Sequence, residues 1–493
     1  MWRWICTLPK KSIQICHVIV WMARVHEISG KKIGHPFQIK ARSSGHCAKS
    51  IHCPFLSNML TLIPGVQSYE WGVPGGARDS MVADFAECTP ELGFQRESST
   101  PYAELWMGTH PTVPSRVVKE DGTRTLLNDV LLEDRGLIGS EVARRFGVDK
   151  TCGALPFLFK VLSINKALSI QAHPDKALAE RLHRTKPHMY KDDNHKPEMA
   201  IALQPFEGFC GFRPVSEVQA FVARISELRK VLGADNVMDQ SLQEAAKLQK
   251  QGANDASQEA KVKDTLKMVF GKLMRASPDV YEPAVSALAE RYSHDTNEVP
   301  EQVRELVVRL NKQYPKDIGV LCTFFLNVVR LERGEAMFLG ANEPHAYISG
   351  HILECMAASD NVVRAGLTPK ARDVDVLIDM LTYESASASA QRLGAPIWDG
   401  DVSGSTLLYN PPIPEFSVLV SSLDKGASCK HRALHGPSIV LITEGQGSFT
   451  VDGKAIPVSK GRVFFVPAEQ ELDVSAESRL VVARAFVEVE LNK

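Results

Sequence analysis

The spacing of apolar residues changes twice along the chain. Between about residues 60 and 212, short apolar runs such as Phe157 to Ile164 alternate with stretches rich in Gly and Pro, a pattern typical of strands and loops. From residue 213 the apolar positions fall three and four residues apart, as on one face of an amphipathic helix. After Thr323 the strand pattern returns. The sequence therefore predicts a β region that is interrupted by a helical insert.

Two apolar stripes mark the helical insert. The first lies at Val218, Phe221, Val222, Ile225, Leu228 and Leu232, and the second at Val303, Leu306, Val307 and Leu310. Ser216, with Gln219 three residues later, predicts a capping box at the start of the first helix. Gly233 suits the left-handed residue that ends it. We therefore expect helices over residues 213–320.

Two passages of the chain resemble each other. Residues 333–341 and 460–468 both run from a basic residue and Gly, through an apolar strand pattern, to Ala. Such a repeat predicts a duplicated small β-barrel, although hairpins of any all-β protein could match over so short a length by chance. When the alignment is extended, Leu472 takes the place of His345.

Composition narrows the class of protein. A chain of 493 residues suffices for two or three domains, and 44% hydrophobic with 23% charged residues is ordinary for a globular protein. The formal net charge of -1 provides no overall basic field for nucleic acid or an anionic membrane, so we expect neither as a partner. The apolar stretch at residues 15–23 is about half the length of a membrane span. The ten cysteines include no CxxC pair, which favours the reducing cytoplasm.

The first 58 residues differ from the rest. They contain nine Lys or Arg against one acid, Glu27. A targeting segment is one interpretation, because transit peptides are basic and poor in acids, but this segment is not clearly Ser-rich or amphipathic. The other is a disordered or spurious extension, since Met59 stands where globular patterning begins. We leave residues 1–58 out of the fold prediction.

Candidate metal ligands begin in the strand pattern of residues 168–176. Alternation along a strand places three side chains on one face, Ser169, Gln171 and His173. Further along, Glu198 offers a carboxylate and His345 a second imidazole. Nitrogen and oxygen ligands without cysteine suit a catalytic zinc ion with an exchangeable position. Spacing alone leaves open that both histidines are ordinary core or surface residues and that Glu198 is a solvated charge.

Several longer sequence motifs point to a protein family. They are LSIQAHPDK at 168–176, HKPEMA at 195–200, ANEPHAY at 341–347, ILECMAASDNVVRAGLTPK at 352–370, YEWG at 69–72 and PYAELWMGTHP at 101–111. In this order they resemble the signatures of type I mannose-6-phosphate isomerases. The resemblance runs from about Leu60 to the C-terminus and is thinnest across the helical insert and about the last hundred residues.

This resemblance implies one zinc ion (Zn2+) per chain, held by Gln171, His173, Glu198 and His345. It implies a fold that is mainly β with a helical insert, made of two cupin-like, jelly-roll β-barrels and an α-helical domain. Residues 59–212 and 321–398 would form the catalytic barrel, 213–320 the helical domain, and 399–493 a second barrel. The second barrel should be free of metal, because it has Leu472 at the position that corresponds to His345 in the first barrel.

The resemblance also implies an activity, the interconversion of mannose 6-phosphate and fructose 6-phosphate through an enediol, which supplies GDP-mannose synthesis and glycosylation. Arg364, in the family's NVVRAG motif, would stabilise the developing negative charge, because a guanidinium stays protonated. Three residues are candidates for proton transfer and are not ranked by sequence: Glu354, His195 and Lys196. Glu354 could instead simply pair with Lys196 or Arg364.

By the same resemblance the substrate phosphate is bound by Ser169, Lys160 and Lys370, while Trp71 and Tyr347 line the sugar pocket. Each lysine could equally be a solvated charge, and Trp71 plain core. One departure from the family is Gly350-His351, where a Gly-Asp turn is usual. His bonds its own backbone less well than Asp, so we expect an effect on local stability rather than on activity.

Two other functions are compatible with these residues. An iron dioxygenase would use two histidines and one carboxylate, although Gln171 as a fourth ligand and the phosphate-directed residues argue against it. A non-catalytic sugar-binding paralogue is the second alternative. We expect a monomer whose partner is a small sugar phosphate.

Overall fold

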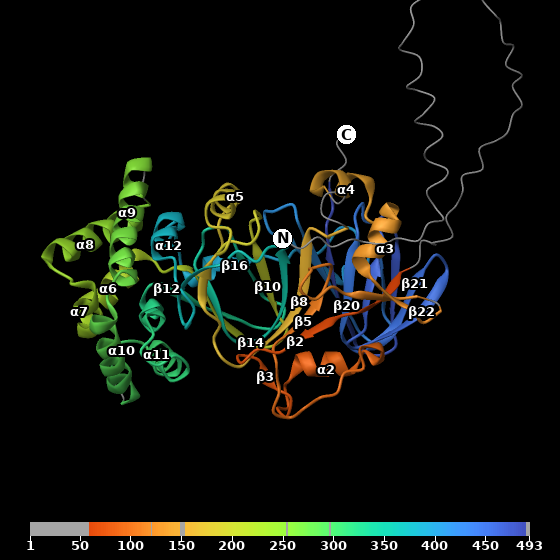
Figure 1. Cartoon of the computed structure of the whole chain (residues 1–493), viewed down its shortest axis with the longest axis horizontal. Helices are drawn as coiled ribbons and strands as arrows, with labels where there is room; N and C mark the ends of the chain where they lie inside the picture. Colours follow the sequence, from red (N-terminus) through yellow and green to blue (C-terminus); the bar gives the residue numbers. More distant parts are fainter. Residues whose placement is uncertain (1–58, 120, 148–152, 253–254, 295–296, 490–493) are drawn as a thin grey trace, which may run out of the picture. The chain divides into compact units, whose positions relative to one another are not determined.

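The computed structural model describes residues 59–119, 121–147, 153–252, 255–294 and 297–489. The predicted extension, residues 1–58, lies outside this range. The described residues belong to one compact unit by their internal contacts. Within the described part of that unit the strands β1 to β11 precede residue 213, a run of helices follows, and strands return from residue 326, in the order that the sequence predicts (Figure 1).

The first barrel is built on an eleven-stranded sheet. Its strands are β2 (Gly65–Gln67), β5 (Glu104–Met107), β8 (Phe157–Ile164), β9 (Ile170–Ala172), β10 (Glu198–Ala202), β11 (Phe206–Phe212), β12 (Leu326–Leu331), β13 (Ala336–Leu339), β14 (His345–Ala357), β15 (Val363–Gly366) and β16 (Arg392–Leu393). The long strand β14 is central, since it pairs antiparallel with β8, β9, β10 and β11. Every residue of β8 is buried, including Lys160 and Ser163, which explains why the other six positions of this strand are apolar.

The second barrel combines an eight-stranded and a four-stranded sheet. The larger contains β1 (Leu60–Ile63), β6 (Arg116–Val118), β7 (Arg124–Leu126), β17 (Thr406–Tyr409), β18 (Ser417–Leu423), β20 (Ser438–Glu444), β23 (Val463–Val466) and β25 (Leu480–Phe486). The smaller contains β19 (Ser428–His431), β21 (Gln446–Val451), β22 (Lys454–Ser459) and β24 (Leu472–Ala476). Leu60 of β1 pairs with Phe465 of β23. The strands β1, β6 and β7 lie in residues 59–212, the range predicted for the first barrel, but they belong to the sheet of the second barrel.

Six helices of the described residues make up the insert: α6 (Val215–Arg224), α7 (Ser226–Leu232), α8 (Asn236–Lys250), α9 (Ala256–Met274), α10 (Pro278–Ser293) and α11 (Glu301–Gln313). They lie beside the first barrel, on the side away from the second (Figure 1). The buried positions of both apolar stripes share one hydrophobic cluster with Phe209, Phe212 and Ile348 of the first barrel. Each fully buried Leu or Val contributes roughly 1.5 to 3 kcal/mol, so the insert is held on the barrel by apolar packing.

The first stripe departs from the prediction in two details. It is not one helix, because the backbone is extended at Ile225, which separates α6 from α7. The capping box is also wrong: Ser216 lies inside α6, whose N-cap is Pro214 without a side-chain bond. Proline suits a helix start because its φ is already close to the helical value. Gly233 ends α7 in the left-handed conformation, with φ 56°, as predicted.

The internal repeat extends into the backbone. β13 and β23 occupy the same place in the two similar passages. The residues with matching positive φ are Gly334 (86°) with Gly461 (85°), and Asn342 with Glu469 (62° each). Non-glycine residues rarely adopt this conformation, so its recurrence at one offset supports a duplicated barrel. Further along the same alignment, His345 opens β14 and Leu472 opens β24.

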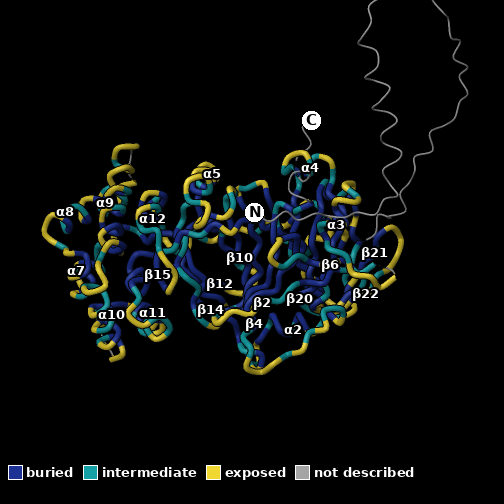
Figure 2. The backbone as a smooth tube through the Cα atoms, in the orientation of Figure 1, coloured by how far each residue is buried: buried dark blue, intermediate teal, exposed yellow. Residues whose placement is uncertain are grey.

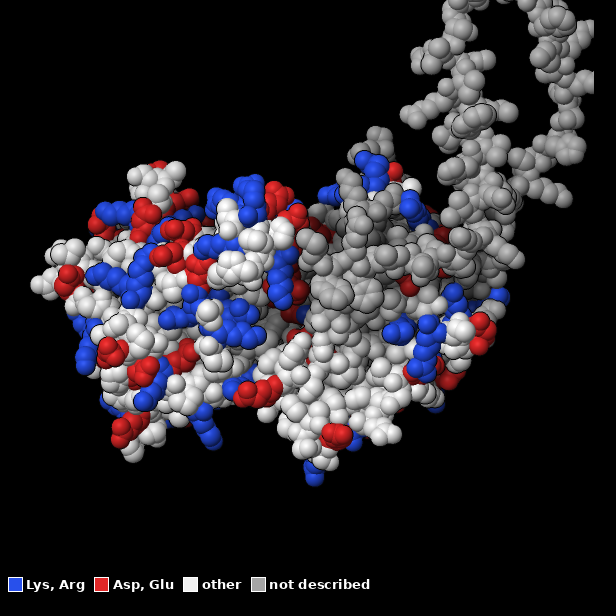
Figure 3. All heavy atoms as spheres, in the orientation of Figure 1, with Lys and Arg blue, Asp and Glu red and all other residues white. Residues whose placement is uncertain are grey.

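Shorter elements complete the unit. They are β3 (Val73–Pro74), β4 (Pro101–Tyr102), α2 (Met81–Glu87), α3 (Leu127–Glu133), α4 (Ser140–Phe146), α5 (Lys176–Thr185), α12 (Val374–Met380) and the 3-10 helices Pro90–Leu92, Arg135–Leu137, Ile318–Phe324 and Ala388–Gln391. Figure 2 shows buried residues along the strands and exposed ones mainly on helices and turns. On the face in Figure 3, basic and acidic side chains are interspersed over the helices. No helix within the described ranges combines the length and apolarity that crossing a bilayer requires.

Candidate active site

Three of the predicted metal ligands meet at strand ends. His173 follows β9 directly, Glu198 opens β10 and His345 opens β14. All three are buried, and one ligand atom from each lies within 4.8 Å of the others. His173 Nε2 is 3.3 Å from Glu198 Oε1, and His345 Nε2 is 3.4 Å from Glu198 Oε2. Residues far apart in sequence thus converge on one small site.

The other nitrogen of each imidazole fixes which atom faces the carboxylate. His173 Nδ1 donates to the carbonyl oxygen of Asn361 at 2.6 Å, and His345 Nδ1 donates to that of Glu343 at 2.9 Å. An imidazole whose single N–H is on Nδ1 carries a lone pair on Nε2. Both Nε2 atoms are buried, and neither has a hydrogen-bond partner among the described residues. Lone pairs facing carboxylate oxygens are unfavourable unless a cation lies among them. The arrangement therefore fits a divalent metal ion, with carbonyls orienting the histidines from behind.

Electrostatics favour the ligand protonation states. Burial lowers the pKa of His173 to about 4, with a further contribution from Lys196, so the imidazole is neutral at neutral pH. Burial alone would raise the pKa of Glu198, but Lys196 and the histidines hold it well below its usual range. A metal ion needs a neutral imidazole and an ionised carboxylate, and His173 and Glu198 provide these two states.

Strand pairing places Gln171 and Arg364 beside the site. The Cα atom of Gln171 in β9 is opposite His345 in β14 and, on the other side, opposite Arg364 in β15. Neither Gln171 nor Arg364 makes a side-chain hydrogen bond to another described residue. Burial lowers the pKa of Arg364 below its ordinary value, yet a guanidinium remains charged at neutral pH. An amide and a cation are thus available next to the two histidines and Glu198.

Glu354 and Lys160 form a buried ion pair across β14 and β8. Lys160 Nζ is 3.0 Å from Glu354 Oε2 and 3.8 Å from Glu104 Oε2. Burial alone would lower the pKa of Lys160, but the two carboxylates raise it, while burial raises the pKa of Glu354. The pairing that the sequence suggested for Glu354, with Lys196 or Arg364, is thus wrong about the partner. Lys160 is already engaged by two acids, so its predicted role at the phosphate stays a prediction.

The neighbouring residues Lys196 and His195 point to different partners. Lys196 Nζ lies 3.0 Å from Glu198 Oε1, at the metal site. His195 Nε2 lies 2.6 Å from Oε1 of Glu415, which stands between β17 and β18 of the second barrel. The second oxygen of Glu415 is buried and has no hydrogen-bond partner in the described part of the chain. His195 therefore ties the loop before β10 to the second barrel.

The predicted substrate-binding residues are more dispersed. Tyr347 donates its hydroxyl to Glu198 Oε2 at 3.3 Å and so adjoins the metal site. Trp71 stacks on Tyr69 with ring centroids 5.7 Å apart, and it lines a cavity of about 350 Å3 together with Thr368 and Pro369. Lys370, which is exposed, follows directly. No hydrogen bond or ion pair between described residues joins Ser169, Lys160 and Lys370, so a shared phosphate site stays a prediction.

His351 is not in a turn. β14 continues through Gly350, with φ 112°, and through His351. The imidazole is buried, with Nδ1 3.0 Å from Ser163 Oγ and Nε2 3.7 Å from Asp79 Oδ2. Burial lowers its pKa. His351 thus connects β14 to β8 and to the residues before α2, and it is not part of the cluster at the metal site.

The second barrel carries different residues at the equivalent positions. In the first barrel Glu198 pairs with Leu339, and Gln171 pairs with His345. In the second barrel Ser438 pairs with Val466, and His431 pairs with Leu472. Ser438 therefore corresponds to Glu198, and His431 corresponds to Gln171. By the same register, Arg484 corresponds to Glu354. Arg484 is fully buried and donates from Nε to Ser438 Oγ at 2.8 Å and from Nη1 to His431 Nδ1 at 3.4 Å. A fixed buried cation therefore stands where the first barrel presents carboxylates.

Four functional neighbours of the site were missed by sequence reasoning. They are Asn361, Glu343, Glu104 and Glu415. Asn361 and Glu343 orient the histidines through their backbone carbonyls. These two residues and Glu104, which lies near Lys160, belong to the family motifs quoted in the sequence analysis. Burial raises the pKa of Glu343 to about 7, although its bond from Thr382 opposes this shift. Their position in these motifs was the sequence signal that could have identified Asn361, Glu343 and Glu104. Glu415 belongs to none of the family motifs, and its role follows only from the structure.

Fold and site together define a class, a metal-binding protein of two cupin-type β-barrels in which the described residues include a buried site of two histidines and a glutamate. Family profiles match in order: "Phosphomannose isomerase type I, catalytic domain" at residues 59–215, the helical insertion domain of the same family at 237–326, and its C-terminal region at 406–454. The chain belongs to the type I phosphomannose isomerase family.

Curated and solved relatives agree with this assignment. The chain is 48% identical to the mannose-6-phosphate isomerase of Cryptococcus neoformans var. neoformans over 443 residues, covering 87% of this chain and 99% of the relative. It is 42% identical to that of Saccharomyces cerevisiae, covering 88% and 100%. A crystal structure of a phosphomannose isomerase variant from Salmonella typhimurium aligns with TM-score 0.69 at 29% identity, covering 87% of this chain and all of that one. A zinc-bound mannose 6-phosphate isomerase aligns equally well, with TM-score 0.69.

Proposed function

We propose that this chain is a zinc-dependent aldose–ketose isomerase that interconverts D-mannose 6-phosphate and D-fructose 6-phosphate through an enediol-type intermediate. The observation that carries the proposal is the pair of partnerless Nε2 atoms of His173 and His345, both turned toward the carboxylate of Glu198. Gln171, opposite His345 in the sheet, would complete the set of ligands. The zinc-bound relative supports zinc as the metal.

The residues around the site suit this reaction. A zinc ion held there would act as a Lewis acid toward the sugar oxygens. Arg364 would stabilise negative charge on those oxygens through a charge-assisted hydrogen bond. Burial raises the pKa of Glu354, which suits a carboxyl group that takes a proton from one carbon and returns it to the other. Lys196 is the second candidate, whereas His195 already has its Nε2 engaged by Glu415.

The phosphate would be held away from the reacting carbons. We assign it to Lys370, Ser169 and Lys160, with Trp71 and Tyr347 as walls of the sugar pocket. Anchoring one end of the sugar positions the other for reaction. We place the enzyme in the cytoplasm as a monomer, where it would supply mannose 6-phosphate for GDP-mannose and glycosylation.

The test is a coupled assay with mannose 6-phosphate, combined with metal analysis of the purified chain. Turnover together with one zinc per chain would support the proposal. Iron with oxygen consumption would instead indicate the dioxygenase, since the described His–Glu–His set also matches that triad. Bound zinc without turnover would indicate a sugar-binding paralogue.

A further inference from the structure

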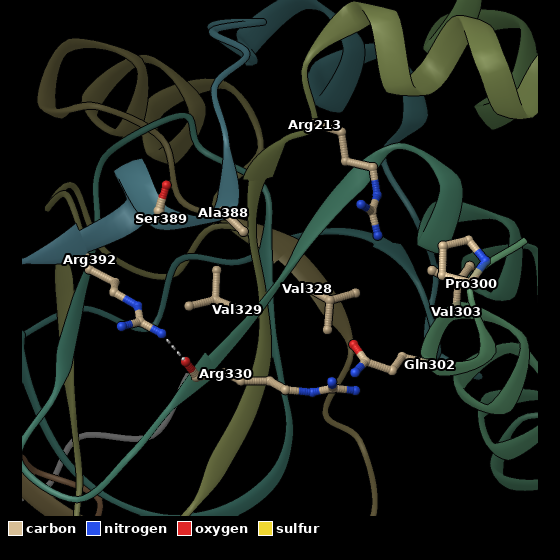
Figure 4. A pocket seen from close by; sticks show the side chains of 10 residues that line it. All are labelled: Arg213, Pro300, Gln302, Val303, Val328, Val329, Arg330, Ala388, Ser389 and Arg392. Carbon is tan, nitrogen blue, oxygen red and sulfur yellow. Dashed lines mark hydrogen bonds between the residues drawn. The ribbon is translucent and has the colours of Figure 1, made fainter.

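A second cavity lies where the helical insert meets the first barrel, away from the metal ligands. It has a volume of about 370 Å3, a size typical of pockets for small ligands. Figure 4 shows its residues. The lining consists of Arg213, Pro300, Gln302, Val303, Val328, Val329, Arg330, Ala388, Ser389 and Arg392. Among the described residues, three arginines and no acidic residue therefore line this space.

The three arginines are held from outside the cavity. Arg330 donates from Nε and Nη2 to Oε1 of Glu207 at 3.2 and 3.0 Å. Arg392 donates from Nη1 to Glu335 at 2.5 Å and from Nη2 to the carbonyl of Arg330 at 2.9 Å. Neither carboxylate belongs to the lining. The ion pairs thus fix the side chains and leave other N–H groups for a ligand.

Arg213 adds a buried donor. It is 8% exposed and donates from Nε to the carbonyl of Thr323 at 3.2 Å and from Nη1 to Glu217 at 2.8 Å. In Figure 4 its guanidinium points toward Val328, while Arg330 runs beneath it toward Gln302. Arg213 Nη2, Arg330 Nη1 and Arg392 Nε have no hydrogen-bond acceptor among the described residues. Arginine donors that are fixed in position and lack acceptors are suited to phosphate oxygens.

The rest of the lining is mainly apolar, with Gln302 and Ser389 as its polar members. Val303, Val328, Val329 and Ala388 present hydrocarbon, and Pro300 marks the start of α11, whose N-cap makes no side-chain hydrogen bond. The first N–H groups of a helix add partial positive charge beside the arginines. The ligand must therefore combine an anionic group with an apolar part. We propose that this cavity binds a small phosphomonoester through its three arginines, with the apolar part of the ligand against the valines.

Calorimetric titration of the zinc-loaded chain tests the proposal with three probes: AMP, inorganic phosphate and mannose 6-phosphate. We expect AMP to bind one site more tightly than inorganic phosphate, because only AMP can also cover the valines. In Arg330→Gln/Arg392→Gln the affinity for AMP should fall about tenfold or more, because charge-assisted hydrogen bonds are lost. The KM for mannose 6-phosphate should not change.

The matched control is Arg309→Gln. Arg309 bonds the same Glu207 carboxylate but does not line the cavity, so its AMP affinity should equal that of the parent. Thermal unfolding of each variant shows whether it is folded. Equal AMP affinity in the control and the double variant, or no binding of AMP at millimolar concentration, would overturn the proposal. AMP no tighter than phosphate would refute the apolar part of it. Isomerase turnover in the same preparations tests the enzyme assignment independently.

Discussion

His195 and Glu415 join the loop before β10 to the second barrel, with Nε2 and Oε1 2.6 Å apart. Their side chains are only 20% and 12% exposed, so the bond is largely shielded from water. β10 begins soon after His195 with Glu198, a residue of the proposed metal site. The second barrel therefore helps to hold a residue of the metal site, although it contributes no ligand itself.

We expect a measurable coupling between these two side chains. In a double-mutant cycle with His195→Asn and Glu415→Gln, the coupling in the free energy of unfolding should be about 1 to 2 kcal/mol, as for a shielded hydrogen bond to a charged group. The control cycle uses His435 and Glu469, a pair 2.8 Å apart that is 38% and 62% exposed and should show little coupling. Additive effects at His195 and Glu415 would contradict the inference.

His345→Ala should abolish bound zinc and turnover and leave a folded protein. A ligand that binds the folded state more tightly than the unfolded state stabilises the folded state, so added zinc should raise the unfolding temperature of the parent but not of this variant. Metal analysis and calorimetry check both outcomes. His294→Ala is the control, because His294 is exposed and outside the site. Turnover by metal-stripped His345→Ala would refute the ligand assignment.

Lys370→Ala should raise the KM for mannose 6-phosphate and leave zinc content unchanged. Loss of one charge-assisted contact to the phosphate predicts a KM increase of about tenfold or more. Lys454→Ala, at an exposed position in β22, should have no effect. Steady-state kinetics distinguish the two, and the same KM in both variants would remove Lys370 from the phosphate site.

The buried His431 of the second barrel predicts a dependence of stability on pH. Burial, with a contribution from Arg484, lowers its pKa from 6.5 to about 3. The unfolded chain therefore binds a proton that the folded chain does not, and stability is lost as the pH falls from about 6.5 toward 3. Between pH 7 and 5 the parent should lose about 2 kcal/mol more than His431→Asn. Denaturant unfolding at both pH values measures this difference, and parallel losses would contradict it.

Features that depend on nearby residues could be predicted from the sequence. The buried run of β8 and the stripes of the insert follow from apolar spacing, and Gly233 was a correct helix end. The pairing of β1 with β23 could not be predicted, because no local pattern specifies a partner about four hundred residues away. The break at Ile225 could not be predicted either, because this residue is buried with the rest of the stripe although its backbone is extended.

The residues of the candidate site also divide into those that the sequence could predict and those that it could not. Spacing suggested Gln171, His173, Glu198 and His345 only as candidates, and the family words made them a set. What makes the site suited to a cation is the direction of each Nε2, and this depends on the carbonyls of Asn361 and Glu343. Backbone carbonyls have no sequence signature. Glu415 was missed for a related reason, since its partner His195 lies in another barrel.

The pairing of Leu60 with Phe465 also has a consequence for synthesis. On the ribosome, β1 and its neighbour β6 emerge long before β23, so one edge of β1 must remain unpaired until almost the whole polypeptide has been translated. A truncated product that stops before residue 463 would expose an unsatisfied edge on which strands of other molecules can assemble. Premature stop codons in the last barrel should thus yield aggregates rather than a shortened working enzyme.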